Sequence, residues 1–384
     1  MIEFFLHSFS TLGHGLIGYI VPFLFVLTIV VFFHELGHFL VARWAGVKVL
    51  TFSLGFGPEL AGFNDRHGTR WKISAIPLGG YVKFFGDESE ASTPASAETL
   101  ASMTEEERAG SFHHKKVGPR AAIVAAGPFA NFILAIVIFA CLFTFLGKPS
   151  TTARVDKVEA GSAAERAGFQ VGDVVTMIDG KIIGNFSDMQ RIVSIHGGDT
   201  LNFDIRRGDA TLQLRGTPEQ LEKKDSFGNV HRLGVLGITR ATNPGDVVTE
   251  RVDPATAVWL GVKETWFVID RTLAYIGGVF TGREAADQVG GPLRIAQISG
   301  QVATIGVAAL IHLAAVLSIS IGLLNLFPVP LLDGGHLLFY AVEAIRGRPL
   351  SERAQEMGFR IGLGLVLMLM VFATYNDILH LAAS

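Results

Sequence analysis

Two histidines and a glutamate, His34, Glu35 and His38, lie within the apolar stretch VVFFHELGHFLVARW at residues 30–44. Ionisable groups inside hydrocarbon cost several kcal/mol, so they usually serve a function there. The H-E-x-x-H spacing places two imidazoles one turn apart on a helix face, which suits a zinc ion. Zinc lowers the pKa of a bound water toward about 7, and the carboxylate between the histidines accepts its proton during attack on a carbonyl. The spacing therefore predicts zinc-dependent hydrolysis; the alternative is a pair of histidines that hydrogen-bond to neighbouring helices.

The composition indicates a membrane protein. Of the 384 residues, 49% are hydrophobic and only 17% are charged, and the mean hydropathy is +0.41. A soluble protein carries about 25% charged residues. The net charge of −3 argues against a nucleic-acid partner. With one cysteine, Cys141, an intrachain disulfide is excluded. The first basic residue is Arg43, so we expect the N-terminal apolar run to be a permanent span and not a cleaved signal.

Four segments are long and apolar enough to cross a bilayer, which takes about 20 residues. The loop after the first span and the loop after the third are rich in Lys and Arg, whereas residues 1–20 and 376–384 contain neither. The positive-inside rule then places both basic loops in the cytosol and both termini outside.

We therefore predict a multi-pass α-helical membrane protein with four transmembrane helices, a cytosolic-side β-hairpin region and one extracytoplasmic β-rich domain. The predicted parts are the first transmembrane helix with H-E-x-x-H (1–46), a cytosolic-side loop with a hairpin and a flexible segment (47–120), the second transmembrane helix (121–147), the β-rich domain (151–240), an amphipathic region on the outer membrane surface (245–305), the third transmembrane helix with the motif LDG (306–336) and the fourth transmembrane helix (357–380).

A third zinc ligand must come from another part of the chain at the same membrane depth as His34 and His38, which lie toward the cytosolic end of their span. Asp333 follows the third span at its cytosolic end, so its depth matches. His336 is close enough to compete, because imidazole is also a good zinc ligand. His312 is excluded, since it lies 21 residues before Asp333, or about 30 Å at helical rise.

The outer loop contains short β-rich runs separated by turn signals. The part EAGSAAERAGFQVGDVVTMIDGKII, residues 159–183, resembles a PDZ domain of the bacterial protease type. The part AGSAAERAG would carry a short helix, and FSDMQRIVSI at 186–195 would form a second helix capped by Ser187. PDZ domains take an extended peptide as an added strand, so we expect binding of peptide C-termini. The alternative is a generic small β-rich domain.

Three motifs in this order, HELGH, GPFANFILA and NLFPVPLLDGG, resemble the site-2 protease family of intramembrane metalloproteases. The similarity is strongest to its RseP-type members, the regulators of sigma-E protease, and covers nearly the whole chain. It implies zinc held by His34, His38 and Asp333, with Glu35 as the catalytic base. RseP-type members of the best-known kind carry two PDZ domains, whereas residues 151–240 have room for one.

The resemblance also implies the setting and the substrates. It implies a bacterial inner-membrane enzyme of regulated intramembrane proteolysis, with the active site toward the cytosol and the PDZ domain in the periplasm. The substrates would be single-span membrane proteins such as anti-sigma factors, cut after a first outside cleavage. Two rival functions stay open: a Ste24-type membrane metalloprotease, which would need a glutamate as third ligand, and a PDZ-containing membrane scaffold without catalysis.

Further residues support a site for an unwound substrate. In the family, the residue matching Asn131 is linked to substrate binding, and Asn325 invites the same interpretation; the alternative is that both amides tie helices together. Pro328 and Pro330 should break the third helix before Asp333. The segment TRWKISAIPLGGYVKFF, with SLGFGPEL as its partner, resembles the family's re-entrant β-hairpin, which would offer a strand edge to substrate. The alternative is a cytosolic hairpin without membrane contact.

Overall fold

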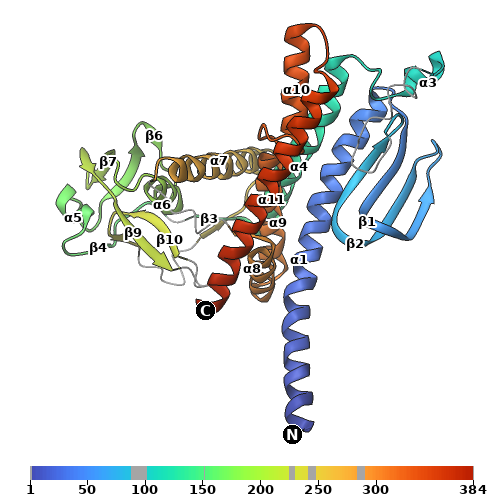
Figure 1. The fold of residues 1–384 in the computed structure, drawn as a ribbon. Helices are drawn as coiled ribbons and strands as arrows, with labels where there is room; N and C mark the ends of the chain where they lie inside the picture. Colours follow the sequence, from blue (N-terminus) through green and yellow to red (C-terminus); the bar gives the residue numbers. More distant parts are fainter. Residues whose placement is uncertain are drawn as a thin grey trace. The chain divides into compact units, whose positions relative to one another are not determined.

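A computed structural model describes residues 2–87, 102–150, 152–224, 230–240, 248–282 and 290–383 (Figure 1). The chain forms two compact units. One comprises residues 1–139, 261–269 and 289–383, and the other comprises residues 140–260, 270–288 and 384.

Four helices among the described residues are long and apolar enough to cross a membrane. They coincide with the four predicted spans, which confirms that part of the prediction. Their apolar windows are Ile17–Trp44, Val117–Leu146, Val307–Asn325 and Arg353–Leu379. The helices that contain them are α1 (Ile2–Trp44), α4 (Val117–Leu146), α9 (Val307–Asn325) and α11 (Glu352–Ala383).

Small residues allow three of these helices to approach closely. A Cβ atom on Gly37 of α1 would lie 2.3 Å from the carbonyl oxygen of Ala126 on α4. A Cβ atom on Gly322 of α9 would lie 3.0 Å from the carbonyl oxygen of Pro128 on α4. Ser318 of α9 also donates a hydrogen bond of 2.9 Å to the carbonyl oxygen of Asn131. Close backbone contact of this kind is how helices pack in membranes, where there is no hydrophobic drive between them.

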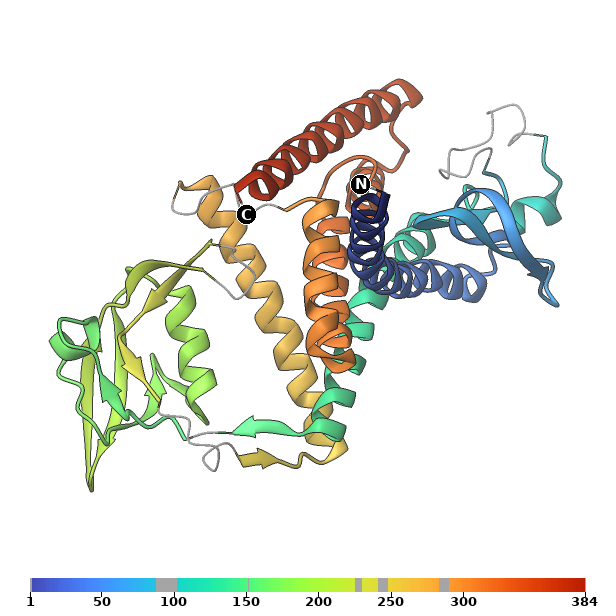
Figure 2. The ribbon, with the colours of Figure 1, turned by 90° about the horizontal axis from the view of Figure 1, so that it is seen from below.

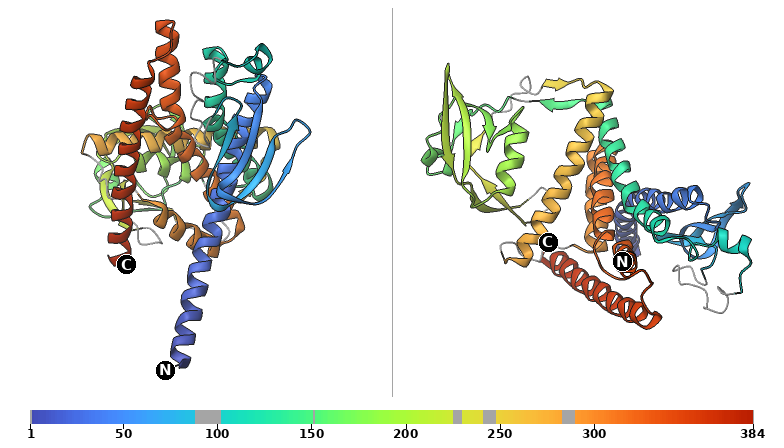
Figure 3. Two further views of the ribbon diagram at one scale, coloured as in Figure 1. Left: turned by 45° about the vertical axis from the view of Figure 1, so that its right-hand side comes forward. Right: turned by 90° about the horizontal axis from the view of Figure 1, so that it is seen from above.

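The third span ends before the LDG motif, as its prolines predict. Helix α9 stops at Asn325, and a new helix, α10 (Asp333–Arg346), starts at Asp333. At this start, Cβ atoms on Gly334 and Gly335 would lie 2.3 and 2.4 Å from carbonyl oxygens of the preceding loop. The two glycines therefore let α10 begin directly against that loop. Figure 3 shows α10 and α11 side by side, and the rings of Phe339 and Phe359 are in edge contact between them.

The loop between the first two apolar spans forms the predicted hairpin from β1 (Val49–Asn64) and β2 (Arg70–Phe84). Both strands bend, so the first half of β1 pairs with both halves of β2: Phe52 is the partner of Val82 and of Trp71. Phe52 is buried and stacks on Trp71 with ring centroids 4.2 Å apart. This core includes Phe39 of α1, and Figure 2 shows the hairpin beside the end of that helix.

The predicted flexible segment at 88–110 lies partly outside the described residues. Its described end is ordered, because Thr104 forms a capping box with Glu107 at the start of the short helix α3 (Glu105–Gly110).

The predicted amphipathic region contains two helices, α7 (Pro254–Phe280) and α8 (Pro292–Ile305). The start of α8 lacks a side-chain cap of its own. Instead, the buried carboxylate of Asp377 on α11 accepts hydrogen bonds from the backbone N–H groups of Gly291, Leu293 and Arg294, at 2.8, 3.1 and 3.1 Å. This contact fastens α8 to the last helix.

The second unit contains the β-rich domain. Its four-stranded antiparallel sheet has the order β6-β5-β7-β8 and surrounds, with two helices, a core that includes Val175, Phe203 and Met189. The elements are β4 (Lys157–Val158), α5 (Ala163–Ala167), β5 (Val174–Ile178), β6 (Lys181–Ile182), α6 (Phe186–Ile195), β7 (Leu201–Arg207), β8 (Ala210–Gly216), β9 (Glu219–Lys224), β10 (Val230–Val235) and β11 (Ile238–Thr239), flanked by the paired strands β3 (Lys148–Ser150) and β12 (Val248–Glu250).

Both predicted helices of this domain are present, but one predicted cap is wrong. Helix α6 is capped by Asn185, whose side chain accepts a hydrogen bond of 2.9 Å from the N–H of Asp188. The predicted cap, Ser187, lies inside the helix. Serine and asparagine are both good N-caps, so residue type alone could not separate positions 185 and 187.

Candidate metal centre

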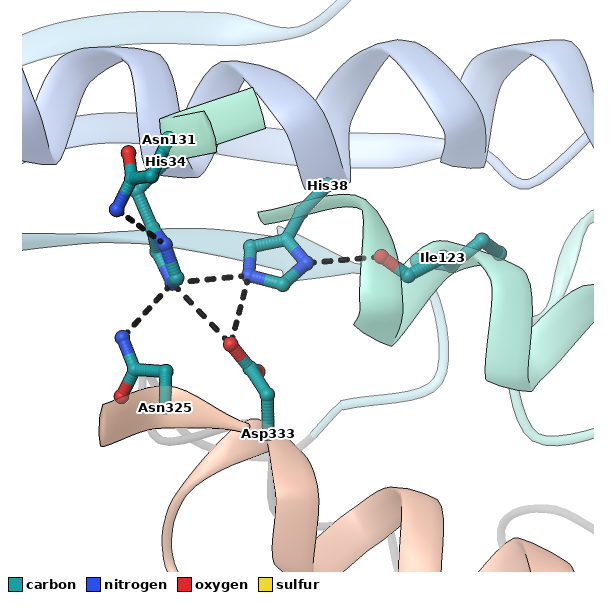
Figure 4. Close-up of polar contacts among 6 residues, drawn as sticks. All are labelled: His34, His38, Ile123, Asn131, Asn325 and Asp333. Atoms are coloured by element: carbon teal, nitrogen blue, oxygen red, sulfur yellow. Dashed lines mark hydrogen bonds and ion pairs between the residues drawn. The ribbon is translucent and has the colours of Figure 1, made fainter. Parts of the chain in front are cut away.

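Two distant helices bring three donor atoms together (Figure 4). His34 and His38 project from α1, one turn apart, and Asp333 is the first residue of α10. Asp333 Oδ2 lies 3.2 Å from His34 Nε2 and 3.6 Å from His38 Nε2, and the two Nε2 atoms are 3.3 Å apart. These are the residues that the sequence predicts as ligands.

The three distances fit a tetrahedral zinc ion. Zinc binds imidazole nitrogen and carboxylate oxygen at about 2.0–2.2 Å, which puts two ligand atoms of a tetrahedron about 3.3–3.6 Å apart. The observed separations of 3.2, 3.3 and 3.6 Å match one face of such a tetrahedron. Asp333 Oδ2 is buried and has no hydrogen-bond donor among the described residues. The residues present therefore fit a zinc ion with three protein ligands, and a catalytic zinc site of this kind would keep its fourth position for water or substrate.

The second nitrogen of His38 is held by the backbone of α4. His38 Nδ1 donates to the carbonyl oxygen of Ile123 at 2.9 Å, which leaves the lone pair of Nε2 free to bind a metal ion. Pro128, inside α4, has no N–H and cannot complete the helical hydrogen bond to Val124. The Ile123 carbonyl lies one residue before this interrupted hydrogen bond. The contact with His38 was not predicted from the sequence, in which Pro128 is the available signal.

The second nitrogen of His34 faces the amide of Asn131, which is fully buried on α4. His34 Nδ1 lies 3.3 Å from Asn131 Nδ2, while Asn131 Oδ1 is buried without a partner. The oxygen and the nitrogen of an amide side chain are assigned from the hydrogen bonds that each can make. With the amide turned, Oδ1 accepts the Nδ1–H of His34, and Nε2 is then free to bind metal. Outer partners of this kind fix the orientation of ligand histidines.

The amide of Asn325, the last residue of α9, also points at His34. Its Nδ2 lies 3.5 Å from His34 Nε2. Figure 4 shows the two amides approaching the ring from opposite sides. Both predicted substrate-binding residues thus lie beside His34. The amide of Asn131 is 3.3 Å from the imidazole ring and that of Asn325 is 3.5 Å from it.

Glu35 lies on α1 between the two histidines and beside the hairpin. A Cβ atom on Gly80 of β2 would lie 3.1 Å from Glu35 Cγ and 2.9 Å from Val31 Cγ1. The backbone of β2 at Gly80 therefore touches the helix turn that carries Glu35. From Gly80 to Phe84, the described partner of β2 is the first half of β1, on one side.

Gly127 of α4 packs directly against the imidazole rings of His34 and His38. A Cβ atom at this position would lie 2.3 Å from His38 Nε2 and 2.9 Å from His34 Cε1. The helix crossing thus requires glycine here.

The other candidate histidines lie away from the donor set. His336 packs against the ring of Phe359 at 5.4 Å, and His312 packs against Phe139 at 5.3 Å. Among the described residues, the group with metal-binding geometry consists of His34, His38 and Asp333.

Apolar helices of membrane-spanning length and a buried His-His-Asp tripod define the chain as a membrane protein with a hydrolytic type of metal centre. The model of peptidase family M50 matches residues 22–369. The chain therefore belongs to this family, the site-2 protease family, and is a zinc metalloprotease.

Relatives in several bacteria agree with this assignment. A protein of Agrobacterium fabrum that carries the inferred name zinc metalloprotease is 54% identical over 363 residues, which cover 94% of this chain and 96% of that one. A Rhizobium meliloti protein with the same kind of name is 52% identical, again over 94% and 96%. Metalloprotease MmpA of Caulobacter vibrioides is 40% identical over 95% of this chain and 96% of its own.

Proposed function

We propose that this protein is an intramembrane zinc endopeptidase in which His34, His38 and Asp333 hold the metal and Glu35 is the catalytic base. The observation that carries the proposal is the tetrahedral spacing of three donor atoms supplied by α1 and α10. The adjacent Glu35 gives this donor set a hydrolytic role, because a purely structural zinc site uses four protein ligands and needs no base.

When bound, zinc supplies a Lewis acid that activates water and polarises a peptide carbonyl. Glu35 takes the proton of the attacking water and delivers it to the leaving nitrogen. The carbonyl of Ile123 and the amide of Asn131 keep the two imidazoles in the orientation that presents Nε2. The amide of Asn325, 3.5 Å from His34 Nε2, would hydrogen-bond the substrate backbone beside the metal.

The substrate must be extended where it is cut, because a helix hides its own backbone. Strand β2 at Gly80 lies against the turn of α1 that carries Glu35. An extended substrate segment lying along β2 there would place its carbonyl groups near the metal. The proposed substrates are single-span membrane proteins, such as anti-sigma factors, cut after a first cleavage outside the membrane.

The β-rich domain at 151–240 would act as a PDZ domain that binds the peptide C-terminus created by that first cut. Its helices and antiparallel sheet fit the predicted order. Basic residues near the ends of the spans support an inner-membrane orientation with both termini and this domain in the periplasm and the metal centre toward the cytosol.

The test compares the wild type with Glu35→Gln on a tagged single-span substrate that already lacks its outer domain. We expect cleavage by the wild type, loss of cleavage on chelation, and no cleavage by Glu35→Gln, which should still bind zinc because its three ligands are intact. Glu356→Gln, an exposed change on α11, is the matched control and should cleave normally. Equal processing by the wild type and Glu35→Gln would remove the enzymatic role.

A further inference from the structure

An ion pair links the first turn of α4 to the last turn of α10. Arg120 Nη2 donates to Glu343 Oε1 at 2.5 Å, and the two side chains are only 14% and 13% exposed. The guanidinium also donates through Nε to the carbonyl oxygen of Lys115 at 3.0 Å and lies 4.9 Å from the ring centroid of Tyr340. One side chain of α4 thus contacts two residues of α10 that are one turn apart.

Both charges lie at the helix end that the helix dipole disfavours. Arg120 is in the first turn of α4, where acidic residues are favoured, and Glu343 is in the last turn of α10, where basic residues are favoured. Each charge therefore weakens its own helix. The pair is explained by the docking of α4 against α10 and not by the stability of either helix.

The neighbouring contacts make this docking surface well packed. Leu337 and Tyr340 of α10 pack against the core cluster that contains Ile123 and Val124 of α4. Burial raises the pKa of Tyr340 to about 12, so its ring stays neutral and can accept the guanidinium on its face.

The ion pair is connected to the metal ligands through both helices that it joins, α4 and α10. Ile123, whose carbonyl holds His38, follows Arg120 by one turn of α4. Glu343 follows Asp333 along α10, about 15 Å away at helical rise. At the other end of α10, Gly334 and Gly335 hold the helix start against the loop. With one end held there, the direction of α10 depends on the contacts along the rest of the helix, and the Arg120–Glu343 pair is the contact near its far end.

We propose that the Arg120–Glu343 pair is a positioning device that fixes the direction of α10 and thereby aims the Asp333 carboxylate at His34 and His38. This deepens the proposed function, because it concerns the assembly of the same metal centre. Arg120 and Glu343 are positioning residues: they act on the metal through the two helices.

The experiment measures zinc affinity of the purified full-length protein by competition with a chromogenic chelator. We expect Arg120→Glu and Glu343→Arg each to bind zinc about tenfold or more weakly, as loss of outer supports commonly does. The double variant with both changes should recover to within about threefold of the wild type, because the pair is rebuilt and each charge then sits at its favoured helix end. Arg360→Glu, which breaks an exposed pair on α11, is the matched control and should leave zinc affinity unchanged.

Two milder variants keep the test decisive if a charge reversal fails to fold. Glu343→Gln keeps the side-chain shape but removes the charge, and Arg120→Lys keeps the charge but removes the planar group over Tyr340. Both should fold and bind zinc several-fold more weakly. Wild-type affinity in the folded single variants, or a double variant no better than its parents, would overturn the positioning role. Failure of the wild type itself to bind zinc would instead count against the metal centre.

Discussion

At the scale of single residues, the metal centre requires a glycine at position 127 as well as its three ligands. The imidazoles of His34 and His38 occupy the space that a Cβ atom on Gly127 would need. We therefore predict that Gly127→Ala lowers zinc affinity by about 10–100-fold, because His38 must move. Gly364→Ala on α11 is the control, since its Cβ would meet no atom within 4 Å. Zinc titration of both variants checks this, and equal affinities would show that the helix crossing adapts.

Asn131 could orient His34 or bind substrate, and these two roles predict different measurements. If its amide orients His34, Asn131→Ala should weaken zinc binding by about 10–100-fold, whereas Asn131→Asp, which keeps an acceptor for Nδ1–H, should bind nearly normally. If Asn131 acts on substrate alone, Asn131→Ala should raise KM and leave zinc affinity intact. Zinc competition beside cleavage kinetics decides between them.

The ligand set could be predicted from the sequence because its chemistry is local. The H-E-x-x-H spacing fixes two ligands, and membrane depth, together with the family resemblance, leads to Asp333, which the structure brings to within 3.2 Å of His34. The supports could not be predicted in the same way. The contacts of His38 with Ile123 and of His34 with Asn131 depend on how α1 crosses α4, and no spacing along one helix reveals that crossing.

At the scale of elements, the β-rich domain contains a buried ion pair that links its turns to its sheet. Arg207, the last residue of β7, donates two hydrogen bonds of 2.8 Å to Asp173 before β5. Burial alone would raise the pKa of Asp173, but the hydrogen bonds from Arg207 and from the N–H of Gln170 lower the pKa below its usual value.

This lowered pKa makes the domain less stable in acid. Because the carboxylate is favoured in the folded state, its contribution is full above the unfolded pKa of about 3.9 and is lost as pH falls through the lower folded pKa. We predict that Asp173→Asn costs about 2–3 kcal/mol at pH 7 and that the difference from wild type disappears in strong acid. A short hydrogen-exchange pulse at one fixed pH, applied to samples equilibrated across a pH series, measures how strongly β5 and β7 are protected at each pH. Asp209→Asn, in the exposed β7–β8 turn, should show no such convergence.

Elements with a clear period were predictable, and those shaped by tertiary contacts were not. The four apolar spans and the break before Asp333 follow from hydropathy and from Pro328 and Pro330. The double pairing of Phe52 with Val82 and Trp71 does not follow from strand propensity, because it arises where both strands bend. The cap of α6 was misplaced by two residues for a similar reason: the structure selects one of several good capping residues.

At the scale of the whole molecule, the proposed orientation can be tested with the chain's single cysteine removed. In a Cys141→Ser background, Asp209→Cys reports on the β-rich domain and Arg348→Cys on the loop before α11, and both native side chains are exposed. An impermeant thiol reagent applied to intact spheroplasts should label position 209 but not position 348, which should react only after lysis. The reverse pattern would invert the proposed topology.

The origin of the tripod on α1 and α10 has a consequence for biosynthesis. A nascent chain carries the two histidines first, and it gains the carboxylate of Asp333 only 295 residues after His38. The domain at 151–240 leaves the ribosome before then, and domains fold as units during synthesis. A polypeptide stopped at Leu332 should therefore insert into the membrane without retaining zinc. The protease would stay inert until the β-rich domain has already been made.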